Sequence, residues 1–357
     1  MLHYQDYLQL DRILNAQILE SDKAGKPVHE EMLFIITHQA YELWFKQILV
    51  ELDAVIRDLD NDRVSEEVML IILSRLQRIE IIFHLLIQQF KVIETLTPME
   101  FLEFRDFLIP ASGFQSFQFR ALSIRLGISE TIAARFSKHL REKDHIPLEQ
   151  IKKMPNLMGV VDSWLARTPF VFSKDFAFWK DYIKAMENFL RSEREIIRNN
   201  AVLSEQDKVS QLKKIDINEQ CIRGTIEEEL YSKKLEKEEV RFSYKAMLSA
   251  LFIFLYRDHP ALHTAYQILS TIVKIDSLLT DWMHAHISLV VKVIGNKIGT
   301  GETSGAFYLS RSAEEHRIFK DLIAIPTLIM RRSEIPLLPE EIRHDLSFNY
   351  VKNKGNS

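Results

Sequence analysis

One stretch near the N-terminus combines an imidazole with several aromatic rings. In the sequence HEEMLFIITHQAYELWFKQ, which begins at His29, the residues Phe34, His38, Tyr41 and Phe45 recur at intervals of three and four. Residues with this spacing share one face of an α-helix. That face is aromatic and carries one titratable group, so it suits a planar aromatic ligand that also needs one hydrogen bond.

A second histidine, His286, lies on an apolar helix face. Its neighbours at three, four, seven and eight residues are Leu278, Leu279, Trp282, Met283, Leu289, Val290, Val293 and Ile294. His284 is only two residues away and points to roughly the opposite side, so a regular helix cannot direct both rings at one metal ion. His286 is therefore either a core histidine or an axial ligand, because a neutral imidazole binds one iron and an apolar wall suits a porphyrin face.

Residues 299–305, GTGETSG, follow this helix and hold three of the ten glycines of the chain. Glycine permits a close approach of the backbone to a ligand, and the hydroxyl of Thr300 adds a donor. The alternative is an ordinary flexible connector. The segment is neither a P-loop nor a dinucleotide fingerprint, because no Gly-Lys-Ser/Thr ends it and no strand precedes it.

Arg105 lies among phenylalanines in FLEFRDFLIPASGFQ, residues 101–115. A guanidinium in apolar surroundings needs an anionic partner, and its fork matches a carboxylate in bidentate fashion. That partner is either a carboxylate of the chain, such as Glu103 or Asp106, or the carboxylate of a ligand.

The composition excludes several classes of protein. Hydrophobic residues make up 46% of the 357-residue chain, which excludes a disordered protein and allows a sizeable core. The net charge of -4, with both signs mixed, gives no electrostatic case for nucleic acid or an anionic membrane. The longest apolar run, 246–256, is far shorter than the roughly 20 residues that a membrane helix needs. Cys221 is the single cysteine, so a disulfide framework is excluded and a cytoplasmic location is expected.

Helical periodicity, with few glycines and prolines to interrupt it, predicts an all-α fold. The expected helices are residues 29–60, 65–94, 112–124, 147–167, 174–200, 203–220, 222–256 and 260–295. We expect one domain over residues 1–357. Within it, residues 204–242 are dense in opposite charges, which predicts a solvated helical excursion from the body.

Four segments, in the same order along the chain, resemble the tryptophan 2,3-dioxygenase family. They are YQDYLQLDRILNAQ from Tyr4, the helix around His38, FRDFLIPASGFQSFQFR around Arg105, and the stretch from His286 through GTGETSG. The two middle motifs are long and specific. The resemblance extends from residue 4 to about residue 335.

The resemblance implies roles for several residues. His286 matches the axial ligand of a haem b iron, and His38 matches the distal histidine, a catalytic-site residue that hydrogen-bonds the substrate's indole N–H. Phe34 matches the ring that packs on the indole, Arg105 the group that binds the substrate carboxylate, and Thr300 the loop residue at the amino-acid end.

Two further groups of residues follow from the same resemblance. Ser112 and Gly113 match groups near the haem. Tyr4, Tyr7 and Leu8, within the N-terminal segment 1–20, match residues that reach into a neighbouring subunit's substrate pocket. The resemblance therefore implies a homotetramer.

The implied activity is haem-dependent insertion of O₂ across the indole C2–C3 bond of L-tryptophan, which gives N-formyl-L-kynurenine. Two positions depart from the family pattern: Ala285 stands where the family usually has arginine, and Glu302 where it usually has glycine. An oxygenase of a modified tryptophan or another indole is therefore the first alternative. The second alternative is a non-enzymatic haem-binding or gas-sensing protein, which Arg105 and Thr300 disfavour.

Overall fold

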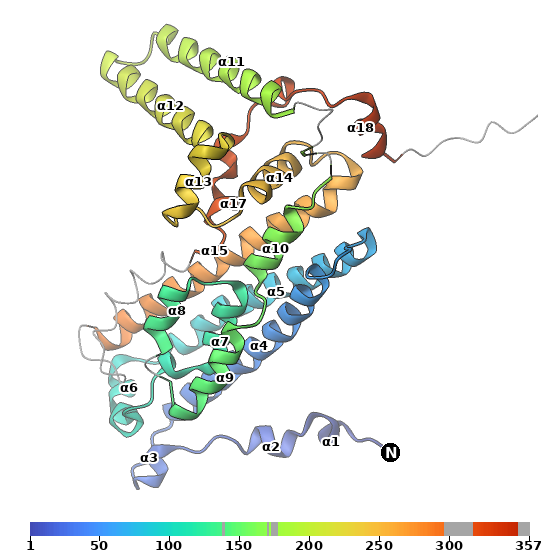
Figure 1. Cartoon of the computed structure of the whole chain (residues 1–357). Helices are drawn as coiled ribbons and strands as arrows, with labels where there is room; N and C mark the ends of the chain where they lie inside the picture. The colour runs from blue at the N-terminus through green and yellow to red at the C-terminus, as the bar shows by residue number, and fades with distance from the viewer. Residues whose placement is uncertain (138–139, 170, 173–177, 296–316, 349–357) are drawn as a thin grey trace, which may run out of the picture. The chain divides into compact units, whose positions relative to one another are not determined.

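A computed structural model describes the chain except for residues 138–139, 170, 173–177, 296–316 and 349–357. The described residues form helices joined by turns and contain no strand, so the predicted all-α fold is confirmed (Figure 1). None of the described helices is long and apolar enough to cross a membrane.

The chain divides into two compact units, each assembled from separate stretches. The first unit comprises residues 1–56, 75–157 and 274–318, and the second comprises 57–74, 158–273 and 319–357. The expectation of a single domain over residues 1–357 stays a prediction. All described residues discussed below as a candidate site belong to the first unit.

The first unit is built around parts of three long helices. Its helices are α1 (Tyr4–Leu8), α2 (Leu10–Leu14), α3 (Glu20–Lys23), α4 (Glu30–Leu59, to residue 56), α5 (Glu66–Ile93, from residue 75), α6 (Pro98–Arg105), η1 (Asp106–Leu108), η2 (Gly113–Gln115), α7 (Phe117–Leu126), α8 (Glu130–Ser137), α9 (Glu142–Lys152) and α15 (Pro260–Ile294, from residue 274).

Aromatic packing joins α4, α5, α7 and α15 in the first unit. The Trp282 ring lies 5.0 Å from the ring of Phe119, 5.7 Å from Phe45, 5.8 Å from Phe90 and 5.9 Å from Tyr41. Large rings at these distances bury much apolar area and fix their relative orientation. This cluster therefore sets how the helix of His38 and the helix of His286 lie against each other.

Local signals explain the ends of the helices that carry site residues. Thr97 caps α6 through a capping box with Glu100, and Pro98 occupies the first turn. Gly127 ends α7 at φ 107°, and Gly295 ends α15 at φ 64°. Both are left-handed conformations that glycine adopts without steric penalty.

The second unit contains the remaining helices. They are α10 (Leu157–Leu165, from residue 158), α11 (Phe178–Asn199), α12 (Glu205–Ile226), α13 (Glu228–Glu236), α14 (Tyr244–Leu255), α17 (Lys320–Ala324), η3 (Ile325–Leu328), η4 (Arg332–Glu334) and α18 (Glu340–Asp345).

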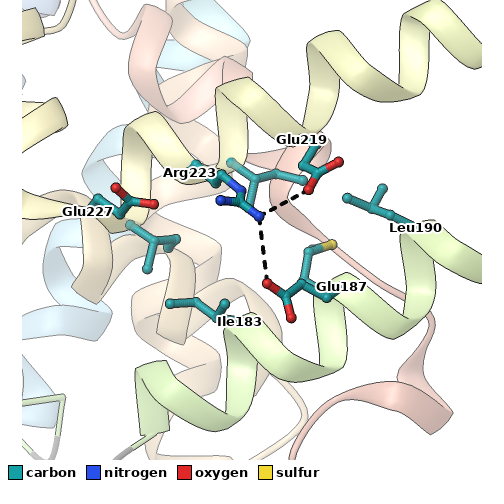
Figure 2. A pocket seen from close by; sticks show the side chains of 9 residues that line it. Ile183, Glu187, Leu190, Glu219, Arg223 and Glu227 are labelled. Carbon is teal, nitrogen blue, oxygen red and sulfur yellow. Dashed lines mark hydrogen bonds and ion pairs between the residues drawn. The ribbon is translucent and has the colours of Figure 1, made fainter.

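The charged segment 204–242 forms α12 and α13, and α12 packs along α11 (Figure 1). Arg223 lies between carboxylates of both helices, 3.3 Å from Glu219 and 3.8 Å from Glu187 (Figure 2). Ile222 and Ile226 are buried. The charges therefore line the outside of an apolar helix contact.

Three predicted helices were wrong in extent. Residues 112–124 divide into η2 and α7, because Ser116 has an extended backbone and caps α7. Residues 147–167 divide into α9 and α10, because Pro155 restricts the residue before it and cannot continue the hydrogen-bond ladder. Residues 222–256 divide into the end of α12, α13 and α14. After α13 the backbone enters the left-handed region at Glu238, φ 57°, and Ser243 caps α14 by accepting from the Ala246 N–H.

Candidate functional site

His38 lies in the middle of the predicted face of α4. Its Nδ1 lies 2.7 Å from the main-chain oxygen of Phe34, and its ring centroid lies 4.1 Å from the Phe34 ring. A carbonyl oxygen only accepts, so Nδ1 must carry the proton. In the neutral ring, Nε2 is then a hydrogen-bond acceptor whose direction the Phe34 carbonyl fixes.

Burial lowers the pKa of His38, although the Phe34 carbonyl and the Glu42 carboxylate act in the opposite direction. The side chain is nevertheless exposed. His38 is thus a neutral acceptor within reach of a ligand.

Only half of the predicted aromatic face is available to a ligand. Tyr41 and Phe45 are 7% and 3% exposed and pack into the Trp282 cluster, and the Tyr41 hydroxyl donates to the Leu86 oxygen at 3.1 Å. Periodicity identified the shared face correctly, but α5 and α15 cover the part of it that Tyr41 and Phe45 form. Phe34 and His38 form the accessible part.

His286 lies on α15 beside two rings. Its centroid is 5.7 Å from Trp282 at an interplanar angle of 22° and 6.3 Å from Phe90 at 29°. Burial and, to a smaller extent, the nearby His38 together lower the pKa of His286 to about 4. The two imidazoles, from α4 and α15, are therefore close enough to interact electrostatically. His284 is exposed, as its spacing predicts.

The donor set around His286 fits a haem better than a bare metal ion. No group of three or more His, Cys, Asp or Glu side chains that could hold a metal ion occurs in the described part of the chain. A haem iron already has four porphyrin nitrogens and needs only an axial ligand from the protein. A neutral imidazole beside Phe90 and Trp282 meets that need. Residue spacing alone does not relate His38 to His286, because they lie on separate helices; only the family resemblance related them.

Arg105 is the last residue of α6 and is largely buried, with 17% of its side chain exposed. The Asp106 carboxylate lies 3.5 Å from its Nη1 and is itself 80% exposed. The internal ion pair that the sequence allowed is therefore present. An ion pair with an exposed partner at this distance contributes little to stability.

α6 is tied to the helix of His38 through rings. Phe101 and Phe104 are buried, and their centroids lie 5.8 Å and 5.6 Å from the Phe34 ring. Phe34, beside His38, therefore contacts the helix that ends at Arg105. Phe34, His38 and Arg105, which the resemblance implies bind one ligand, therefore come from α4 and α6, two helices that pack directly on each other.

Ser112 and Gly113 form the turn that follows Arg105. Ser112 caps η2 through a capping box with Gln115, and its Oγ accepts from the Phe114 N–H at 3.3 Å. A Cβ added at Gly113 would meet no atom of the chain within 4 Å. Internal packing therefore does not require glycine there, which fits a close contact with a bound group.

The N-terminal segment offers many apolar side chains to solvent. Tyr4 and Tyr7 are 73% and 70% exposed, Leu8 is partly exposed, and neither α1 nor α2 buries a residue. The segment is attached to α4 only further along, where the Gln17 amide donates to the Gln39 side chain at 2.6 Å. Large apolar groups at such exposure are characteristic of an interaction surface.

Thr300 and Glu302 lie outside the described residues. Ala285, the other departure from the family pattern, lies on α15 directly before His286 and is partly exposed. Phe90 was not identified from the sequence, because it reaches His286 from α5 and only the packing of α5 on α15 reveals it.

Comparisons with known proteins agree with this arrangement. A family model described as tryptophan 2,3-dioxygenase matches residues 1–329. A tryptophan 2,3-dioxygenase of Alteromonas mediterranea is 40% identical over 351 residues, 97% of both chains. Those of Bdellovibrio bacteriovorus and Xenopus laevis are also 40% identical, over 98% and 96% of this chain and 99% and 85% of their own. With a match of this extent, the chain belongs to the tryptophan 2,3-dioxygenase family.

Proposed function

We propose that this protein is a haem-dependent dioxygenase that converts L-tryptophan and O₂ to N-formyl-L-kynurenine. Both oxygen atoms enter the product as the indole C2–C3 bond breaks. The observation that carries the proposal is the pair of imidazoles from α4 and α15, one with a fixed acceptor nitrogen and one kept neutral by burial.

His286 is the residue that would hold the haem b iron, with Ser112 and Gly113 close to the macrocycle. When bound, the haem supplies the chemistry that activates dioxygen. The low pKa of His286 keeps its imidazole unprotonated, which ligation requires.

His38 would bind the indole end of the substrate. With Nδ1–H donated to the Phe34 oxygen, Nε2 is left to accept the indole N–H. Phe34 lies beside that ring and offers an apolar face to the indole. His38 therefore acts as a fixed acceptor, and its low pKa keeps that nitrogen free of a proton at neutral pH.

Arg105 would bind the substrate carboxylate in place of its contact with Asp106. Because Arg105 and His38 hold opposite ends of one molecule, they determine which indole bond lies next to the oxygen. Orientation of this kind is a large part of what a protein adds to cofactor chemistry. Thr300 is assigned to the amino-acid end on the family resemblance alone.

We further propose a homotetramer in which Tyr4, Tyr7 and Leu8 reach a neighbouring subunit's substrate pocket. Their exposure supports this, since α1 and α2 bury no residue within the chain. A cytoplasmic location is proposed from the single cysteine.

Turnover of the reduced, haem-loaded protein in air tests the function. L-Tryptophan should yield N-formylkynurenine, with both atoms of labelled O₂ in the product. Turnover of a substituted indole but not of tryptophan would favour the alternative that Glu302 suggests, an oxygenase of a modified tryptophan or another indole. Full haem occupancy without turnover of any indole would contradict the proposal.

A further inference from the structure

A pair of residues to which the family resemblance gives no role joins α7 to α4. Gln118, in the first turn of α7, donates from Nε2 to the main-chain oxygen of Glu42 at 2.7 Å and to its carboxylate Oε2 at 2.9 Å. Both side chains are partly buried. A hydrogen bond to a carboxylate is about twice as strong as one between neutral groups, so this contact is a firm attachment.

The attachment has a particular position on α4. Glu42 follows His38 by four residues, and Phe34 precedes it by four, so all three share one helix face. Phe34 is where Phe101 and Phe104 of α6 pack. The chain that leaves α6 at Arg105 and enters α7 is thus attached to α4 one turn before His38 and one turn after it.

The segment between these attachments, residues 106–116, is anchored differently at its two ends. Phe107 and Leu108 pack on the apolar cluster of Leu96, Phe101, Phe104 and Val293. Further along, the Arg120 guanidinium of α7 donates to the Phe114 oxygen at 3.2 Å, and the remaining bonds are local turns such as Ser116 N–H to the Gly113 oxygen at 3.1 Å. The position of residues 109–116 relative to α4 therefore depends on α7, which Gln118 attaches to α4.

We propose that Glu42 and Gln118 are a positioning pair that sets the place of Arg105 and the 106–116 segment relative to His38. The inference rests on the proposed function, in which Arg105 and His38 bind opposite ends of one substrate. Neither member of the pair touches the substrate. The pair acts on the spacing between the two groups that do.

The substitution Gln118→Met tests the pair, because methionine keeps the length of the side chain and removes both donated hydrogen bonds. Gln88→Met is the matched control, since Gln88 is exposed on α5. In the haem-loaded enzyme we expect Gln118→Met to raise KM for L-tryptophan on the order of tenfold, with kcat within about twofold. The reason is that the contact of Arg105 with the substrate carboxylate is the same in the ground state and the transition state, and a displaced Arg105 weakens it in both.

Two further measurements separate positioning from general stability. Amide hydrogen exchange should rise in residues 106–116 and stay as in the wild type over α4 and α5. The single variant Glu42→Gln keeps both acceptor oxygens and replaces the carboxylate by a neutral amide oxygen. It should therefore raise KM less than Gln118→Met does, to within about threefold of the wild type.

The possible results decide between the two proposals. A KM in Gln118→Met equal to that of Gln88→Met overturns the positioning role, and so does faster exchange in Gln118→Met throughout the first unit. Absence of N-formylkynurenine from the wild-type enzyme overturns the proposed function instead, and exchange in residues 106–116 then still reports on the attachment.

Discussion

The lowered pKa of the His286 imidazole should make the haem-free protein lose stability in mild acid. Burial lowers the pKa of His286 from 6.5 to about 4. Between these values the unfolded chain binds a proton at this ring and the folded chain does not. The free energy of unfolding therefore falls as pH falls below 6.5, and the loss is complete near pH 4.

The size of the effect follows from the shift. Each pKa unit corresponds to about 1.4 kcal/mol, so the whole loss is roughly 3 kcal/mol and roughly 2 kcal/mol is reached by pH 5. The pKa of His38 is also lowered, so His38 contributes with the same sign. No such loss is expected above pH 6.5 from either ring.

The variant His286→Phe removes the titration and keeps a ring beside Phe90 and Trp282. Urea unfolding at pH 7.5 and pH 5 should show the wild type losing roughly 2 kcal/mol more than this variant. His84→Phe, a change at an exposed histidine of α5, is the control and should follow the wild type. Equal losses in the wild type and in His286→Phe would refute the argument that burial holds His286 unprotonated.

Three further substitutions test the site and the helix that positions it. His286→Ala should abolish haem binding, seen as loss of the Soret band and its partial recovery with added imidazole. Full haem occupancy in this variant would mean that another residue is the axial ligand. Arg105→Ala should cost about 2–5 kcal/mol in kcat/KM, as for truncation of one partner of a buried charge pair, and a change below about twofold would make Arg105 structural. Thr97→Ala removes the capping box of α6 and should lower the free energy of unfolding by about 1 kcal/mol in urea titrations; no loss would mean that Glu100 and Pro98 suffice.

The sequence was sufficient for the class of fold and for part of the site. Spacing of three and four residues placed Phe34 and His38 on one face of α4, and the apolar neighbours of His286 predicted a buried ring. Such periodicity reports which residues share a face. It does not report what covers that face, which is why Tyr41 and Phe45 were included in the ligand surface and are core residues in the structure.

Contacts between distant segments were beyond the reach of the sequence pattern. Nothing local pairs Gln118 with Glu42, or His38 with His286, because these pairs form only when α7 and α15 pack on α4. The break after α13 was missed for a different reason. Glu238 adopts a left-handed conformation that glycine or asparagine usually adopts, so the residue type at this position did not predict the end of a helix.

Desolvation of the two imidazoles explains both the proposed activity and the loss of stability in acid. An imidazolium can neither ligate iron nor accept the indole N–H, so both roles need neutral rings at neutral pH. Burial supplies this for His286 and for His38, and the Phe34 oxygen then fixes which nitrogen of His38 is the acceptor. The same burial opposes protonation in acid and so destabilises the folded chain there. A substitution that exposed the His286 ring to water would therefore improve stability in acid while weakening haem ligation.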